Sequence, residues 1–418
     1  MVSNRINNSV VFRYGFVGFV LSFAALPLYV AIPKIYSEFG LSISTIGFLL
    51  MLIRLTDAIT DPIFGKLIDS TKERKHARWL KPSLVVLIVS FGFLINPPNL
   101  SESPLILLVW FLFFTLLVSL FNGICTIAYQ SWVVALSKVN DIRNRLISAR
   151  EVCALTGLIL ASFLIGMGWY EVMATLVLFF GFIAIYFTKS IEKSINSMKS
   201  NIISTNFLLS NFLKTKPKKF FFLASFLVAF ANGIPALLFV FFYKDVLKIN
   251  DINGGFLLAI YFLSAAFSIP IWRRVMVLVG NKATWISSVI LSIVFFSLSV
   301  FLSGGDFYFF LIICIFTGIA LGAELICPPS VLTDILSLNK NDLGLAGTYF
   351  GVWNLLIKCA LALTAGIVLP SLLYLGYDPN LLTDSGVNAL GFMYSIAPCI
   401  IKAISLIFII KIIYKQIR

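Results

Sequence analysis

Residues 53–69 read IRLTDAITDPIFGKLID, a stretch that places two aspartates and one arginine inside an otherwise apolar run. Asp57 and Asp61 are four residues apart, so a helix puts both on one face, with Arg54 one turn before Asp57. An ionisable group at membrane depth is costly and faces a cavity or a partner helix rather than lipid. The stretch therefore predicts a transmembrane helix with a polar face.

The sequence on either side indicates that lipid surrounds most of the chain. Of its 418 residues, 60% are hydrophobic and 12% charged, and the mean hydropathy is +0.99. A soluble domain could not bury that much apolar surface. Apolar runs of the ~20 residues that cross a bilayer recur along the chain, and their lack of alternation favours helices over strands. We expect an all-α membrane protein with twelve spans, near residues 11–33, 43–65, 82–97, 104–136, 150–168, 170–188, 220–244, 253–272, 283–303, 307–335, 347–374 and 388–414.

The net charge of +14 follows the expected topology and does not require a nucleic-acid partner. Of the 32 Lys and Arg residues, 26 lie in alternate loops or at the span ends beside them. We expect the protein in the inner membrane, and the positive-inside rule then places both termini in the cytoplasm. The longest basic segment divides the chain, and we expect a six-helix bundle over 1–188, a cytoplasmic linker over 189–219 and a second bundle over 220–418.

Histidine and cysteine give no support to an enzyme or a metal centre. The six cysteines are scattered singly in apolar spans, without metal-ligand spacing. The lone histidine, His76, follows the second span in a basic loop, where we expect it to be solvated. A membrane-embedded enzyme would need a converging nucleophile, base or metal set. We therefore expect a protein that is not an enzyme and has no cofactor.

The paired carboxylates favour cation binding. Closely placed carboxylates are hard oxygen ligands suited to Na⁺, or they share a proton because two like charges resist ionising together. Pro62 directly after Asp61 weakens the helix ladder and frees a backbone carbonyl that offers another oxygen. The alternative is a salt-bridged scaffold in which the pair only locks helices together.

Two further spans carry charges at membrane depth. In YFGVWNLLIKCALAL (349–363), Lys358 follows Asn354 by one turn, with Trp353 beside it, and the aspartates of the second span are candidate anions for this lysine.

In GAELICPPSVLTDI (322–335), Glu324 precedes an expected helix break at Pro328 and Pro329. Glu324 would bind substrate or carry a proton, or would serve as a packing or gating carboxylate. Asp334, Asp69 and Glu151 lie near the cytoplasmic side, and we expect them in a charge network that closes it.

RLTDAITDPIFGKLID resembles the helix-two signature of the glycoside-pentoside-hexuronide:cation symporters, a melibiose-permease-like branch of the major facilitator superfamily. The resemblance continues through AYQSWVVALSKVNDIRNRLISAREV (128–152) and GTYFGVWNLLIKCALALTAG (347–366). It implies two six-helix bundles that rock about a central site and a coupling cation bound at Asp57 and Asp61 near Asn354. It also implies a substrate pathway lined by Arg54, Trp132, Trp353 and Lys358, and an inner charge network containing Arg143, Arg145 and Arg150.

One departure concerns the substrate. The melibiose permease carries sugar-binding carboxylates in helix one and helix four, where this chain aligns Ser22 and Ala128. These residues cannot offer the charge-assisted, bidentate acceptors that hold adjacent sugar hydroxyls. Galactoside recognition is therefore not expected, and the extra Glu324 leaves a cationic or amphipathic substrate open.

The sequence thus predicts a secondary transporter that moves a small organic solute, such as a sugar or glycoside, with Na⁺ or H⁺. The alternative within transport is a carrier of lysolipids or amphipathic drugs, because the 41 phenylalanines could line an apolar cleft. A packing or receptor role would leave the buried charges unexplained. The expected partners are the small-molecule substrate, the coupling cation and the lipid bilayer, and the expected assembly is a monomer.

Overall fold

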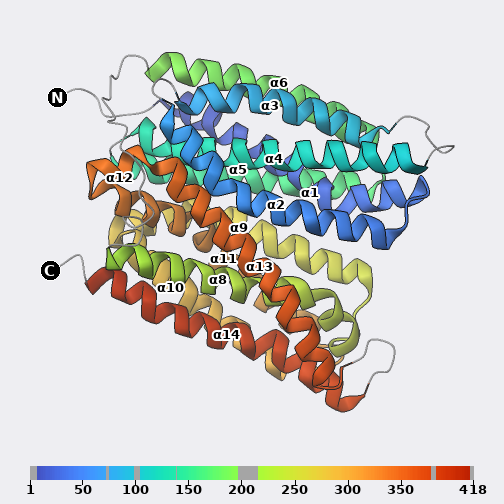
Figure 1. Cartoon of the computed structure of the whole chain (residues 1–418). Helices are drawn as coiled ribbons and strands as arrows, with labels where there is room; N and C mark the ends of the chain where they lie inside the picture. Colours follow the sequence, from blue (N-terminus) through green and yellow to red (C-terminus); the bar gives the residue numbers. More distant parts are fainter. Residues whose placement is uncertain are drawn as a thin grey trace. The chain divides into compact units, whose positions relative to one another are not determined.

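The computed structural model describes residues 7–71, 75–97, 104–137, 139–195, 215–377 and 383–414, which are helical and contain no strand (Figure 1). Within these ranges twelve helices have 17 residues or more, together with short α12 (Lys340–Gly344), a π-helical turn η1 (Phe242–Val246) and a 3-10 turn η2 (Leu298–Phe301). The long helices are α1 (Asn8–Glu38), α2 (Ile43–Ser70), α3 (Lys75–Ile95), α4 (Pro104–Leu136), α5 (Asn140–Gly166), α6 (Tyr170–Ile195), α8 (Lys216–Phe241), α9 (Asp251–Val279), α10 (Asn281–Ser297), α11 (Phe307–Ser337), α13 (Ala346–Tyr374) and α14 (Asp384–Tyr414).

The helices confirm the predicted all-α membrane fold. Eleven of them, among the described residues, are long and apolar enough to cross a bilayer. The remaining long helix is α2, which has 28 residues and carries Arg54, Asp57 and Asp61 in its middle. Its length exceeds the ~20 residues that a span requires, so its polar groups and not its length set it apart from the other eleven.

Several helices extend beyond the expected spans on the basic side. Helix α5 begins at Asn140, ten residues before the predicted span, and α9 continues to Val279, so Arg273 and Arg274 are helical. A helix can leave the hydrocarbon without losing its internal backbone bonds, and hydropathy alone does not reveal this extension. Of the predicted linker at 189–219, residues 196–214 lie outside the described residues.

Two local predictions are wrong. His76 is 5% exposed and lies in the first turn of α3, because that helix begins at Lys75 rather than near residue 82. Helix α11 continues through Pro328 and Pro329 without the expected break. Each proline removes one backbone donor, and neighbouring helices make such a loss tolerable in a membrane-spanning helix.

The chain forms two compact units. Unit 1 comprises Met1–Asn206 and Leu336–Leu355, and unit 2 comprises Phe207–Ile335 and Leu356–Arg418. Helix α13 therefore begins in unit 1 and ends in unit 2, whereas the sequence analysis places all of it in the second bundle.

Unit 1 is built on contacts of α1 with α5 and α6, of α3 with α4 and α6, and of α2 with α4. Aromatic rings of α1 pack against rings of α6. The ring centroids of Phe19 and Phe180 are 5.1 Å apart and those of Phe16 and Phe187 are 5.4 Å apart, and both pairs meet edge to face. Such edge-to-face pairs add to the stabilisation that burial of the rings provides.

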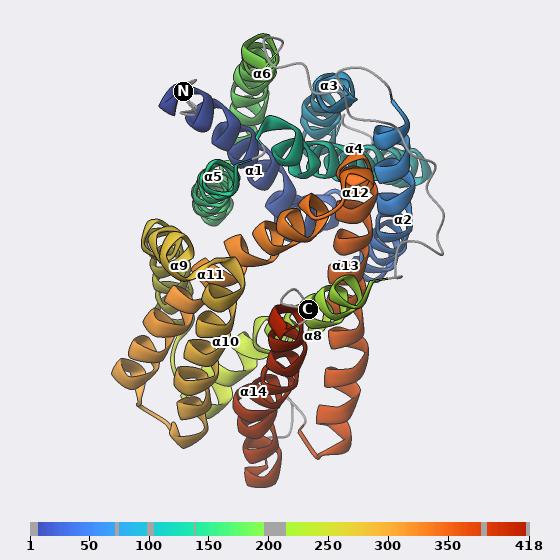
Figure 2. The same ribbon diagram turned by 90° about the vertical axis from the view of Figure 1, so that its left-hand side faces the viewer.

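In unit 2, α14 runs beside α8 and α10, as both views show (Figures 1 and 2). Phe242 of η1 stacks on Tyr394 of α14 with ring centroids 3.9 Å apart, and Phe310 of α11 packs on the same pair. A single residue, Gly280 with φ +86°, separates α9 from α10. This left-handed conformation favours glycine, and it lets the chain reverse within one residue.

Helices α1 and α5 approach through glycine. A Cβ on Gly157 of α5 would lie 2.4 Å from the carbonyl oxygen of Phe19, and one on Gly15 of α1 would lie 2.9 Å from the carbonyl oxygen of Ala149. Both neighbours are backbone atoms, which cannot move without shifting a helix. Small residues at such crossings allow close packing between membrane helices.

We therefore expect Gly157→Ala to destabilise unit 1 by about 1–3 kcal/mol, the cost of overpacking a close contact. Gly166→Ala, at the C-terminal end of α5, is the matched control because no atom lies within 4 Å of its new Cβ. Thermal unfolding of the purified protein measures the difference, and equal melting temperatures of the two variants would contradict this account of α1 and α5.

Candidate functional site

Asp57 and Asp61 of α2 lie buried against α4, where they are 6% and 1% exposed. Both Oδ1 atoms converge on Gly123: they lie 2.9 Å and 3.0 Å from the position that a Cβ on this glycine would occupy. The missing side chain at Gly123 thus makes the space in which the two carboxylates lie. The sequence prediction of this site relied on charged residues in apolar spans and did not include Gly123. A glycine in such a span does not stand out from its neighbours.

Helix α4 adds neutral oxygens to this region. Ser119 lies one turn before Gly123 on the same face, and Asn122 is its neighbour in sequence. Within the described residues, the buried Ser119 hydroxyl and Asn122 Oδ1 have no hydrogen-bond partner. Buried polar groups of this kind are usually satisfied, so these two oxygens are candidate ligands.

The arrangement offers hard oxygen ligands. Carboxylate, hydroxyl and amide oxygens are the ligands of alkali and alkaline-earth cations, and a close carboxylate pair also accepts a shared proton. In the part of the chain that the structure describes, no three His, Cys, Asp or Glu residues group as a metal site.

The first turns of α13 belong to unit 1. They bring Asn354 to the face of α4 that carries Gly123. Asn354 Nδ2 donates to Gln130 Oε1 at 3.1 Å, and Gln130 lies two turns beyond Gly123. Gly351 packs so closely on α2 that a Cβ there would lie 2.5 Å from the Asp61 carbonyl oxygen. Trp353 is 7% exposed and meets Phe350 edge to face.

Asp69, at the end of α2, caps the beginning of α13. Its carboxylate accepts hydrogen bonds from the amides of Gly347 at 3.0 Å and Thr348 at 2.6 Å, and from the Thr348 hydroxyl at 2.8 Å. A Cβ on Gly65 would lie 2.4 Å from the Gly347 carbonyl oxygen, so the two backbones touch. The carboxylate thereby satisfies orphan donors and opposes the positive end of the helix dipole.

The other residues predicted for a cytoplasmic charge network have separate contacts. Arg150 forms an ion pair with Glu151 at 2.5 Å, so two predicted members of the network are in contact. Arg143 donates to Asn140 and Arg145 donates to Asn8. In unit 2, Asp334 Oδ2 accepts a hydrogen bond of 2.7 Å from Asn281.

The remaining predicted pathway residues of unit 1 differ in exposure. Ala128 is fully buried and Trp132 is 5% exposed, whereas Ser22 is half-buried and Arg54 is exposed. In unit 2, Lys358 is half-buried on α13, and its expected pairing with the α2 carboxylates stays a prediction.

Glu324 has partners that the sequence analysis missed. Its Oε1 accepts from Lys402 Nζ at 2.7 Å, and its Oε2 accepts from Asn232 Nδ2 at 2.7 Å. Glu324 and Lys402 are 8% and 6% exposed. A lone lysine inside the apolar stretch IKAISLIF (401–408) was the available signal. Both carboxylate oxygens are therefore engaged, which argues against Glu324 as an open receptor for a cationic solute.

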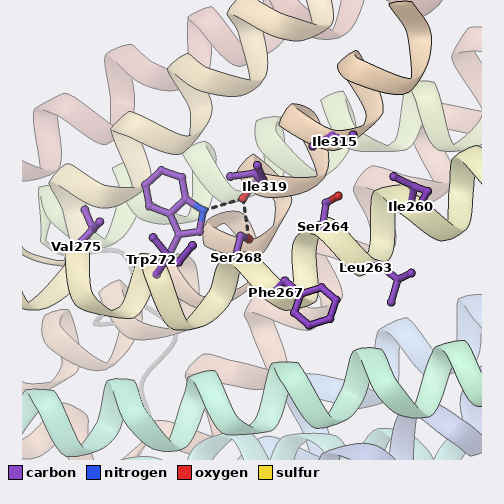
Figure 3. Close-up of a pocket in the computed structure, with 10 residues that line it drawn as sticks. Ile260, Leu263, Ser264, Phe267, Ser268, Trp272, Val275, Ile315 and Ile319 are labelled. Atoms are coloured by element: carbon purple, nitrogen blue, oxygen red, sulfur yellow. Dashed lines mark hydrogen bonds between the residues drawn. The ribbon is translucent and has the colours of Figure 1, made fainter. Parts of the chain in front are cut away.

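Unit 2 also has an apolar groove of about 590 Å³ between α9 and α11 (Figure 3). Its walls include Leu263, Phe267 and Ile271. Two polar groups of its lining bond within the protein: Trp272 Nε1 and Ser268 Oγ both donate to the Ile319 carbonyl oxygen, at 2.7 and 3.1 Å. Ser264 adds one hydroxyl to an otherwise apolar wall, so the groove offers mainly hydrocarbon contact.

Comparison with known proteins supplies the family context. The sequence profile of the family described as MFS/sugar transport protein matches residues 11–415. The fold is similar to that of a bacterial homologue of the iron transporter ferroportin in its outward-facing state, with a TM-score of 0.73, 13% identity and coverage of 96% of this chain and 99% of that one. It is also similar to the E. coli fucose:proton symporter FucP (TM-score 0.69, 12% identity, coverage 97% and 99%) and to the human organic anion transporter TETRAN (0.67, 14%, 96% and 98%).

The cap at Asp69 generates a local prediction. Asp69→Asn removes the charge that opposes the helix dipole and should weaken the α13 N-terminus by about 1–2 kcal/mol. Amide hydrogen exchange at Gly347 and Thr348 should accelerate roughly tenfold or more, since 1.4 kcal/mol is a factor of ten. Ser70→Ala, which changes a neighbouring exposed hydroxyl, is the control. Unchanged exchange at both amides would show that Asp69 does not hold this helix end.

Proposed function

Because this chain belongs to the MFS/sugar transport protein family, we propose that it is a secondary transporter that couples movement of a small organic solute to a cation by alternating access. Its family and fold make it a multi-pass membrane transporter rather than an enzyme. The observation that carries the coupling proposal is the convergence of Asp57 and Asp61 on the space left by Gly123.

The carboxylate pair suits the coupling role electrostatically. Two negative charges that are each less than a tenth exposed repel one another in a medium of low dielectric constant. Binding of Na⁺ or H⁺ relieves this repulsion, so the loaded and empty sites differ strongly in energy. A site of this kind can link cation occupancy to the conformation that the solute requires. Asn354, held by Gln130, is the expected neutral ligand beside the pair.

A sugar or glycoside is the proposed class of solute. The family description supports sugar transport, and the fucose:proton symporter has a similar fold. Ser22 and Ala128 leave no carboxylate at the two aligned sugar-binding positions, so we propose a substrate other than a galactoside. Trp132 and Trp353 offer aromatic faces for an apolar sugar face, and Arg54 and Lys358 offer donors to hydroxyl or anionic groups.

We also propose that the protein belongs to the melibiose-permease-like branch and is a monomer. It would lie in the inner membrane with both termini in the cytoplasm. Alternate placement of the basic residues supports this orientation. No further cofactor enters the proposed mechanism.

One observation favours a second candidate function, transport of a lysolipid or an amphipathic drug. The groove between α9 and α11 has a volume typical of small-molecule sites and an apolar lining. An alkyl or aryl group fits such a surface, whereas a free sugar would lose its hydrogen bonds to water there. A thermal-shift screen of sugars, glycosides, organic anions and lysolipids, each with and without Na⁺, distinguishes the two classes because a bound ligand stabilises the protein by mass action.

Asp57→Asn and Asp61→Asn should each abolish cation-driven accumulation of the solute identified by that screen. Asparagine keeps the size of the side chain but removes the charge that compensates a dehydrated cation. We expect the solute in proteoliposomes under an imposed Na⁺ or H⁺ gradient to reach only its equilibrium distribution, because the gradient no longer drives its uptake. Exchange of solute down its own gradient should persist.

The melting temperature separates this outcome from a scaffold role. If the pair only anchors a basic side chain, removal of one carboxylate leaves a buried charge uncompensated at a cost of about 3–5 kcal/mol, and the variants should lose stability. A well-folded single variant that still concentrates solute against its gradient would refute the coupling role.

Gly123→Ala tests the geometry of the same site without changing any charge. Its new methyl group would lie about 3 Å from both carboxylate oxygens, which can move aside because they end flexible side chains. We expect a folded protein whose half-saturating cation concentration rises roughly tenfold. Gly47→Ala on α2, which meets no atom within 4 Å, should leave cation dependence unchanged. Equal cation dependence of the two variants would exclude Gly123 as part of the site.

A further inference from the structure

A buried ion pair lies in the interior of unit 2, where four helices contribute to it. Glu324 of α11 and Lys402 of α14 are joined by Asn232 of α8 and Ser292 of α10. Lys402 and Glu324 are less than a tenth exposed, and Ser292 is 6% exposed. Charges at this depth are expensive, and one without a partner would be far more so.

The contacts of the lysine ammonium resemble the coordination of a small cation. Lys402 Nζ donates to Glu324 Oε1 at 2.7 Å and to Ser292 Oγ at 2.6 Å. Asn232 satisfies the second carboxylate oxygen at 2.7 Å and so fixes the orientation of Glu324. A carboxylate and a hydroxyl oxygen are ligands that Na⁺ also takes, and the lysine ammonium is a compact point charge on a flexible stem.

We propose that Asn232, Ser292 and Glu324 form a monovalent-cation site whose permanent occupant is the ammonium group of Lys402. The tethered ammonium supplies from within the chain the positive charge that would otherwise come from solution. The site is therefore closed to external cations in the native protein, and it becomes a receptor for Na⁺ or a short alkylammonium when the lysine side chain is removed.

The pattern of contacts distinguishes this interpretation from simple helix packing. A lysine that only filled space would be replaced at little cost by an apolar side chain of similar volume. Here the ammonium has two oxygen partners and the carboxylate has two donors, so removal of the lysine leaves an anion and a hydroxyl facing the vacated space. Because alanine keeps Cβ, that space has the size of three methylene groups and an ammonium, and ethylammonium can partly refill it.

This assignment also bears on coupling, a consequence that rests on the proposed function. If the second unit compensates Glu324 internally, this carboxylate is not available to the coupling cation, which leaves Asp57 and Asp61 as its proposed ligands. The tethered-cation assignment itself depends on no transport measurement.

The test compares melting temperatures of the full-length purified protein in ethylammonium, Na⁺ or N-methylglucamine chloride at constant ionic strength. Lys402→Ala should melt below the native protein in the bulky N-methylglucamine salt. It should gain roughly 5 °C at saturating ethylammonium or Na⁺, as expected for a ligand that binds only the folded state.

The native protein and the double variant Glu324→Gln with Lys402→Ala are the matched controls. Neither should show this additional response, because the first retains its tethered ammonium and the second has no carboxylate to compensate. Any Na⁺ response at Asp57 and Asp61 is common to all three proteins and cancels in the comparison.

A folded Lys402→Ala protein that responds to these cations no more than the double variant would overturn the proposal. If Lys402→Ala yields no folded protein, Lys402→Gln replaces it, because the amide keeps hydrogen-bond donors but lacks the charge. Its melting temperature should rise with Na⁺ relative to Glu324→Gln with Lys402→Gln, and equal responses would likewise overturn the proposal. Neither result depends on whether Asp57 and Asp61 couple transport.

Discussion

The free-energy cost of a charge in a low-dielectric interior governs both units of this protein. Unit 1 buries two carboxylates side by side, with space and neutral oxygens provided by α4. Unit 2 buries one carboxylate together with its own ammonium and two further hydrogen-bonding groups. In the second arrangement the protein itself supplies the compensating positive charge. The same physical constraint thus acts on a close carboxylate pair in one unit and on an internal ion pair in the other.

The fold could be predicted from the sequence because its determinants are local. Runs of about twenty apolar residues identify membrane helices with little reference to the rest of the chain, and α4 was predicted with its exact bounds, 104–136. Helix ends were less predictable where charged residues continue a helix beyond its apolar run, as at Arg143 in α5. His76 was predicted to lie in a solvated loop for the same reason: α3 begins at Lys75, and hydropathy does not mark that start.

The candidate site was only partly predictable, because much of it depends on contacts between distant segments. Asp57 and Asp61 were evident from their spacing, but Gly123 acts through the absence of a side chain and Ser119 through an ordinary hydroxyl. Lys402 was visible as a lone charge, although nothing in the sequence joined it to Glu324, 78 positions away. Asp69 was assigned to a charge network, which stays a prediction, and its hydrogen bonds to backbone amides could not be read from a pattern of charged side chains.

The internal compensation of Glu324 has an electrical consequence. A carboxylate and an ammonium held 2.7 Å apart carry no net charge, so the membrane potential exerts almost no net force on the pair. A cation bound at the proposed α2 site would change the charge of that region by one unit, and the potential acts on such a charge with about 2.3 kcal/mol per 100 mV. Voltage would thus act on the proposed binding step, while the ion pair of unit 2 contributes only a small dipole.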